Sequence, residues 1–134
     1  MWLVVIAIES TESLGASHTF GMMWRVAQAL HLPFSMDQLT EINHILRKCG
    51  HFLGYGILGV LFARAWTMTL RAGSLARALV LGLFCTLCVA SADEFHQLFL
   101  PGRTGAAHDV ALDMTGAAVL AGIAVPAIRR ARQQ

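Results

Sequence analysis

The chain of 134 residues is rich in apolar side chains, since 56% of its residues are hydrophobic and only 13% are charged. An ordinary soluble domain carries about 25% charged residues, so the composition argues against that class and indicates a protein that lies in lipid. The formal net charge of +2 provides no basic surface of the kind that nucleic-acid binding requires, and we expect no nucleic-acid partner.

The amino-terminal part contains one short apolar segment followed by a mixed, amphipathic stretch. Residues 2–8 are apolar but fall far short of the ~20 residues of a membrane span. Apolar side chains then recur at helical spacing from Phe20 to Leu30, which predicts a helix in the outer interface that Pro33 breaks. Ser35 and Gln38 match a capping box, which predicts the start of a longer helix.

Three apolar runs dominate the rest of the chain, at residues 49–70, 75–92 and 110–128. Each is about as long as a helix that crosses a bilayer. We therefore expect an all-α fold: a multi-pass transmembrane bundle of three full spans, in one domain that covers residues 1–134. Ser74 is a plausible N-cap for the second span.

Small residues four apart predict where these spans approach one another. The pairs are Gly50 with Gly54 and Ala118 with Gly122. Small side chains at this spacing let two helix backbones come close in a membrane. The three cysteines fit no disulfide framework, and we interpret them as packing residues.

The charges predict the orientation in the membrane. If the basic carboxy-terminal segment stays in the cytoplasm, the turn with Arg71 and Arg77 is cytoplasmic too, and Arg64 can extend its charge to the same side. All eight acidic residues and all six histidines then fall on the outer side. We therefore expect any functional site to be extracytoplasmic.

Two stretches carry the polar side chains that point to function. Along the first, Lys48, His51 and Tyr55 share one helical face. The second begins with an acidic pair at the end of a span, continues through a Pro-Gly-Arg turn, and ends with two aspartates four residues apart at the start of the last span. The candidate ligand-binding residues are Lys48, His51, Tyr55, Asp93, Glu94, Gln97, Arg103, Asp109 and Asp113.

The two stretches resemble the paired signatures of the VanZ-like family over residues 45–125. The resemblance implies a small multi-pass helical membrane protein of the cell envelope. The family takes its name from a protein linked to low-level resistance to the glycopeptide antibiotic teicoplanin, and the resemblance implies no particular reaction or cofactor. Members usually open with a full first span, where this chain shows only the apolar residues 2–8.

Several of these residues also have structural interpretations. Lys48 is equally well explained as an anchor at the interface. Asp109 is better explained by capping and by the dipole of the helix that it opens. Asp113 lies a turn deeper, so we expect a buried partner for it, such as Arg103 or Lys48. The adjacent Asp93 and Glu94 suit either acid–base chemistry or an ion-pair network that locks the helices.

The sequence contains possible metal ligands but no recognised metal-binding motif. Histidines and carboxylates are good ligands for zinc or manganese, but no His-Glu-x-x-His or similar spacing is present. We therefore expect no metal and no cofactor.

Three functions remain open. The first is binding of an anionic, phosphate-bearing membrane lipid or lipid-linked envelope precursor, with Arg103, Lys48 and His51 facing the phosphate. The second is a membrane-embedded hydrolase or transferase acting on a lipid headgroup, with Glu94 and His51 as the catalytic candidates. The third is a structural scaffold whose ion pairs lock the helices and which assembles as a homo-oligomer.

Overall fold

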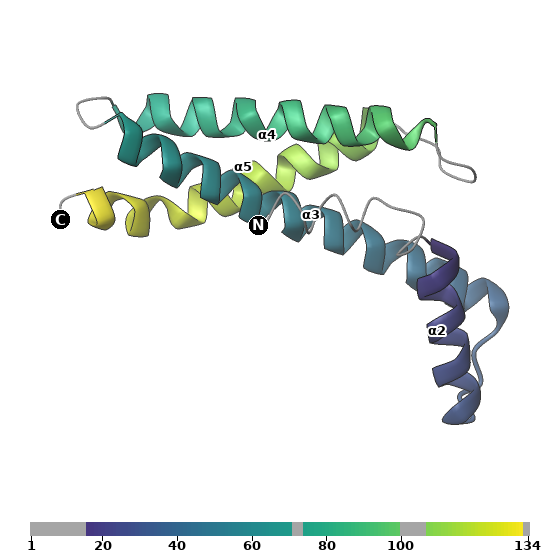
Figure 1. The fold of residues 1–134 in the computed structure, drawn as a ribbon. Coiled ribbons are helices and arrows are strands. Elements are labelled where there is room, and N and C mark those ends of the chain that lie inside the picture. Colours follow the sequence, from purple (N-terminus) through teal and green to yellow (C-terminus); the bar gives the residue numbers. More distant parts are fainter. Residues whose placement is uncertain (1–15, 71–73, 100–106, 133–134) are drawn as a thin grey trace. The chain divides into compact units, whose positions relative to one another are not determined.

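The computed structural model describes residues 16–70, 74–99 and 107–132, and all regular structure in these ranges is helical (Figure 1). The chain divides into two compact units, Met1–Gly50 and His51–Gln134. Four helices are described, α2 (Ala16–Ala29), α3 (Met36–Thr69), α4 (Leu75–Gln97) and α5 (Ala107–Arg132). The apolar residues 2–8 and the two turns predicted at residues 71–73 and 101–105 lie outside the described residues.

In the first unit, α2 is the predicted amphipathic helix and ends before Pro33. The amide of His31 donates to the carbonyl of Gln28 at 3.1 Å, and the amide of Leu32 donates to that of Ala27 at 2.9 Å. His31 has a φ of 52°, the left-handed conformation that commonly closes a helix. These two bonds satisfy carbonyls that the end of the helix would otherwise leave unpaired.

The start of α3 confirms the predicted capping box. The amide of Gln38 donates to Ser35 Oγ at 3.2 Å, and the amide of Ser35 donates to Gln38 Oε1 at 2.9 Å. Each side chain thus satisfies a backbone donor of the other residue. The helix runs for 34 residues, more than the ~20 that cross a bilayer, so it contains residues beyond its membrane span.

In the second unit, α4, α5 and the part of α3 from His51 onward pack through small residues. Gly82 of α4 meets α3 so closely that a Cβ built on it would lie 2.7 Å from the backbone nitrogen of Ala63. Gly116 of α5 approaches α3 closely enough that a Cβ there would overlap the carbonyl of Phe52. Only glycine fits at such contacts, because any larger residue would push the two backbones apart.

The close approaches among the described residues do not involve the predicted pairs. A Cβ built on Gly50 or on Gly122 would meet no atom of the described residues within 4 Å, and Ala118 is exposed. Spacing of four residues places two small side chains on one face, but it does not say which face meets a neighbouring helix.

Three helical segments are long and apolar enough to cross a membrane, namely Met36–Thr69, Leu75–Gln97 and Ala107–Arg130. Their outward surfaces carry large apolar side chains, among them Val80, Phe84 and Ile123, whose exposed fractions are 65%, 60% and 74%. The predicted all-α fold with three membrane-spanning helices is thereby confirmed. Ser74 is the N-cap of α4, where its hydroxyl accepts from the amide of Arg77 at 3.2 Å, as predicted.

Candidate functional site

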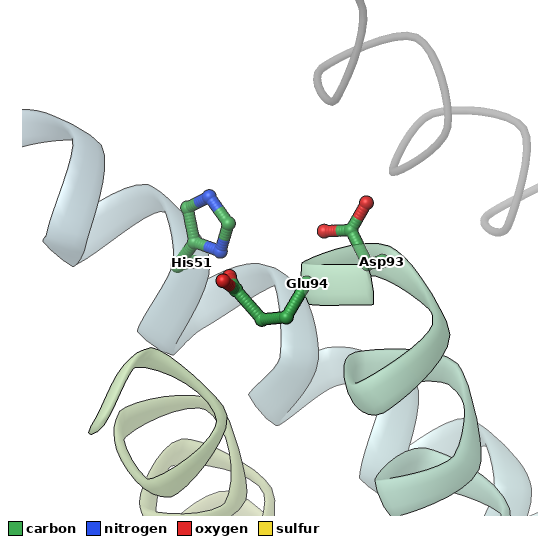
Figure 2. Close-up of side chains that lie close together, drawn as sticks. All are labelled: His51, Asp93 and Glu94. Atoms are coloured by element: carbon green, nitrogen blue, oxygen red, sulfur yellow. The ribbon is translucent and has the colours of Figure 1, made fainter. Parts of the chain in front are cut away.

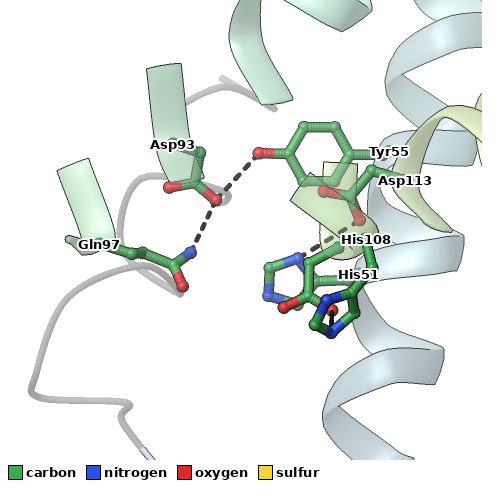
Figure 3. A network of polar contacts seen from close by, with 7 residues as sticks. His51, Tyr55, Asp93, Gln97, His108 and Asp113 are labelled. Carbon is green, nitrogen blue, oxygen red and sulfur yellow. Dashed lines mark hydrogen bonds and ion pairs between the residues drawn. The ribbon is translucent and has the colours of Figure 1, made fainter. Parts of the chain in front are cut away.

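Polar side chains gather in the second unit where α4 ends and α5 begins. Asp93, Glu94 and Gln97 lie in the last turns of α4, and Asp113 lies in the second turn of α5. The face of α3 that follows Gly50 supplies an imidazole and a phenol to the same place (Figure 3). We call this group the polar cluster, and its members are His51, Tyr55, Asp93, Glu94, Gln97 and Asp113.

Asp93 is held by two donors from different helices. The hydroxyl of Tyr55 on α3 donates to Asp93 Oδ2 at 3.0 Å, and the side-chain amide of Gln97 donates to the same oxygen at 3.1 Å (Figure 3). Gln97 follows Asp93 by one helical turn, so the two side chains share a face. Tyr55 and Gln97 are both buried, and a buried polar group without a partner is costly. The arrangement fixes the carboxylate of Asp93 in one orientation.

His51 and Asp113 form the second contact of the polar cluster. His51 Nδ1 lies 3.4 Å from Asp113 Oδ1, and the imidazole stacks on the ring of Tyr55 with 6.0 Å between ring centroids. The side chain of Asp113 is 0% exposed, while that of His51 is 27% exposed. In the part of the chain that the structure describes, neither carboxylate oxygen of Asp113 takes part in a hydrogen bond. The sequence predicted Arg103 or Lys48 as the partner of Asp113. The structure places His51 beside it, and Arg103 lies outside the described residues.

Glu94 extends from α4 toward the imidazole of His51 (Figure 2). It is only 6% exposed. One ligand atom from each of His51, Asp93 and Glu94 lies within 4.8 Å of the other two. A carboxylate beside an imidazole in such a setting can exchange a proton with it or share a cation with it.

Three of the predicted site residues are not members of the polar cluster. Asp109 lies in the first turn of α5, inside the helix and therefore not at its N-cap, and its Oδ1 is 3.2 Å from Nε2 of the exposed His108. A carboxylate in a first turn also compensates the helix dipole, as expected for Asp109. Lys48 is half-buried on α3 in the first unit. Arg103 lies outside the described residues.

The structure thus brings six of the nine candidate residues into one cluster. Their convergence follows from two features of the sequence. Helical spacing predicts that His51 shares a face with Tyr55, and that Asp93 shares a face with Gln97. Residues 98–106 connect α4 to α5, so the end of the one helix and the start of the other cannot lie far apart.

Comparison with curated proteins and with solved structures finds no match to this chain. A family model does match. It is that of VanZ/LLP1, and the match extends over residues 1–129, which includes the amino-terminal segment as well as the two signature stretches. With three membrane-spanning helices and a match over nearly its whole length, the chain belongs to the VanZ/LLP1 family.

Proposed function

We propose that this VanZ-like membrane protein binds a phosphate-bearing headgroup at the polar cluster, on the outer side of the membrane. The headgroup belongs to a membrane lipid or to a lipid-linked precursor of the cell envelope. The observation that carries the proposal is the contact between His51 and Asp113, in which a fully buried carboxylate stands behind a partly exposed imidazole. A carboxylate in this position can pair with an imidazolium ring, and the second N–H of that ring can donate a hydrogen bond to an anion.

The structural alternative accounts less well for Asp113. A scaffold made of ion pairs gains stability only when its buried charges have their hydrogen bonds satisfied. Neither oxygen of Asp113 meets that condition among the described residues. A buried carboxylate without its full set of hydrogen bonds is costly, so the state of Asp113 is more readily explained by a role in binding.

Two further cations of the signature stretches complete the proposed site. Arg103 follows α4 in the sequence and precedes α5, and its guanidinium is suited to grip two phosphate oxygens at once. Lys48 precedes His51 by three residues in the sequence, and its role as a further point charge is proposed from that spacing alone. In this proposal the carboxylates of the polar cluster orient the cations and keep the empty site close to neutral.

The sidedness belongs to the same proposal. The basic carboxy-terminal segment favours a cytoplasmic end for α5, which places the junction of α4 and α5 outside. A binding site there faces envelope precursors during their assembly, and a role in resistance to glycopeptide antibiotics such as teicoplanin would follow from altered handling of such a precursor.

The test compares two substitutions of Arg103 in the purified protein. Nanodiscs that contain phosphatidylglycerol or a polyprenyl phosphate serve as probes, with diacylglycerol as the phosphate-free control, and retained lipid is counted by native mass spectrometry. Arg103→Lys keeps the charge but loses the paired donors, so we expect at least a tenfold loss of bound phospholipid with unchanged thermal stability. Arg25→Lys, at an exposed position of α2, is the matched control and should bind as the wild type does.

Two outcomes would contradict the proposal. Equal retention of the phosphate-bearing and phosphate-free lipids would show that the site does not recognise phosphate. The scaffold would instead be supported if Arg103→Lys kept the lipid retention and stability of the wild type while Arg103→Met lost about 3–5 kcal/mol in free energy of unfolding. Only the loss of the charge would then matter.

An enzymatic function is the second candidate, and the position of Glu94 favours it. A buried carboxylate beside an imidazole is a suitable general acid or base for attack of water on a headgroup phosphate. Release of headgroup from the same nanodiscs, lost in Glu94→Gln while lipid retention persists, would establish the reaction. Retention without turnover would leave binding as the function.

A further inference from the structure

The donor set on α3 and α4 has the composition of a metal centre, and its ligand atoms lie close together. One imidazole nitrogen of His51 and one carboxylate oxygen each of Asp93 and Glu94 lie within 4.8 Å of one another. Figure 2 shows these three side chains close together, with Glu94 extending toward His51. Ligand atoms at about 2.1 Å from one ion in tetrahedral geometry lie about 3.4 Å apart, so the side chains would have to close their separations by up to about 1.4 Å to complete the coordination.

The hydrogen bonds of Asp93 are those expected of a metal ligand. Both donors that the structure places on it, Tyr55 Oη and Gln97 Nε2, reach the same oxygen, Oδ2. Neither of these two bonds uses Oδ1, which is therefore the oxygen available to a ligand. Carboxylates that ligate metals are commonly held by outer hydrogen bonds of this kind, which orient the carboxylate before the ion arrives.

Asp113 provides an independent indication. It comes from the third helix, is fully buried, and faces the imidazole of His51 with 3.4 Å between Oδ1 and Nδ1. Neither of its oxygens takes part in a hydrogen bond among the described residues. A buried carboxylate in this state is stabilised by a cation nearby, and a carboxylate behind a ligating histidine is a recurrent feature of metal sites.

We propose that His51, Asp93 and Glu94 bind one divalent transition-metal ion, Mn²⁺ or Zn²⁺, with Asp113 positioning the imidazole. One nitrogen and two carboxylate oxygens suit these two ions, and a protein site of this size leaves coordination positions for water or a ligand oxygen. The expectation of no metal rested on spacing along the chain, whereas these donors come from two helices. The proposal stands without the proposed function. When the ion is bound, His51 is a neutral ligand and cannot donate from its ligating nitrogen to an anion, so the ion would then take the place of the protonated ring as the contact for a phosphate.

The experiment measures metal binding by the full chain, purified in detergent through an affinity tag that contains no histidine. Equilibrium dialysis against Mn²⁺ or Zn²⁺, followed by elemental analysis, gives the stoichiometry and the Kd, and the electron paramagnetic resonance spectrum of Mn²⁺ reports its ligands. We expect one ion per chain for the wild type. His51→Gln and Glu94→Gln should lose stoichiometric binding, and Asp113→Asn should weaken it about 10–100-fold.

Matched controls are available elsewhere in the chain. His108→Gln removes an exposed histidine of α5, and Glu41→Gln removes an exposed acid of α3. Both should bind the ion as the wild type does. Because a variant can fail by misfolding, thermal unfolding is measured with and without the ion, and the ion should raise the Tm of the wild type and the controls but not that of Glu94→Gln.

Failure of this inference can be told apart from failure of the proposed function. A wild type that binds no ion above the level of Glu94→Gln, or a Glu94→Gln variant that binds as tightly as the wild type, overturns the metal site. Lipid retention in nanodiscs treated with a chelator is scored separately. If the protein retains phosphate-bearing lipid after chelation, the proposal of phosphate binding stands without the metal. If the protein binds one metal ion per chain but retains no lipid selectively, the metal site stands and the proposal of phosphate binding fails.

Discussion

The contact between Gly116 of α5 and the backbone of α3 offers the sharpest test of the packing. A Cβ at residue 116 would overlap the carbonyl of Phe52, while a Cβ at Gly122 on the same helix would meet no described atom within 4 Å. Replacement of glycine by alanine inside a helix gains up to about 1 kcal/mol of helix propensity at either position. Overpacking costs about 1–3 kcal/mol, and the cost tends to the upper value where backbone atoms must move.

The gain in helix propensity from glycine to alanine is the same at residues 116 and 122, so it cancels when Gly116→Ala is compared with Gly122→Ala. Gly116→Ala should therefore be less stable than Gly122→Ala by about 1–3 kcal/mol in free energy of unfolding. Titration of the protein from mild detergent into sodium dodecyl sulfate, followed by circular dichroism, measures this difference. A Gly116→Ala variant as stable as Gly122→Ala would refute the close approach of α3 and α5.

Two more predictions follow from the structure and the charges. Tyr55→Phe removes one of two donors to Asp93, so the free energy of unfolding should fall by about 1.5–3 kcal/mol in the same titration. The control is Thr115→Val, which removes a hydroxyl that is bonded within its own helix on an exposed face. Its free energy of unfolding should stay close to that of the wild type. Equal stability of the two variants would mean that the hydroxyl of Tyr55 does not contribute to stability. A reporter fused after Gln134 should be active only in the cytoplasm, and activity only outside the cell would reverse the proposed orientation.

The membrane fold could be predicted from the sequence because lipid leaves the backbone few choices. An apolar run of about 20 residues must satisfy its own peptide groups in the bilayer, and a single chain segment does so as a helix. The helix starts at Ser35 and Ser74 were predictable for a similar reason. A capping side chain bonds to a residue three positions on, so the signal is contained in a few neighbouring residues.

The contacts between helices were not predictable in the same way. Gly82 and Gly116 make the close approaches, yet nothing in their local sequence distinguishes them from Gly122. The pairing of His51 with Asp113 depends on the relative depth and rotation of α3 and α5, which are set by packing along the whole helix. Helical spacing could place His51 beside Tyr55 on one helix, and Asp93 beside Gln97 on another. It could not predict that these two pairs of side chains contact each other.

The outward surfaces of the three spans have a consequence for how this protein is held together. Val80, Phe84 and Ile123 are as well solvated by lipid tails as they would be by another helix, so bringing the helices together gains little from the hydrophobic effect. Once each helix is inserted, assembly depends on a few glycine contacts and on the polar cluster. Changes of detergent or bilayer thickness should therefore alter the assembled state more readily than the helix content.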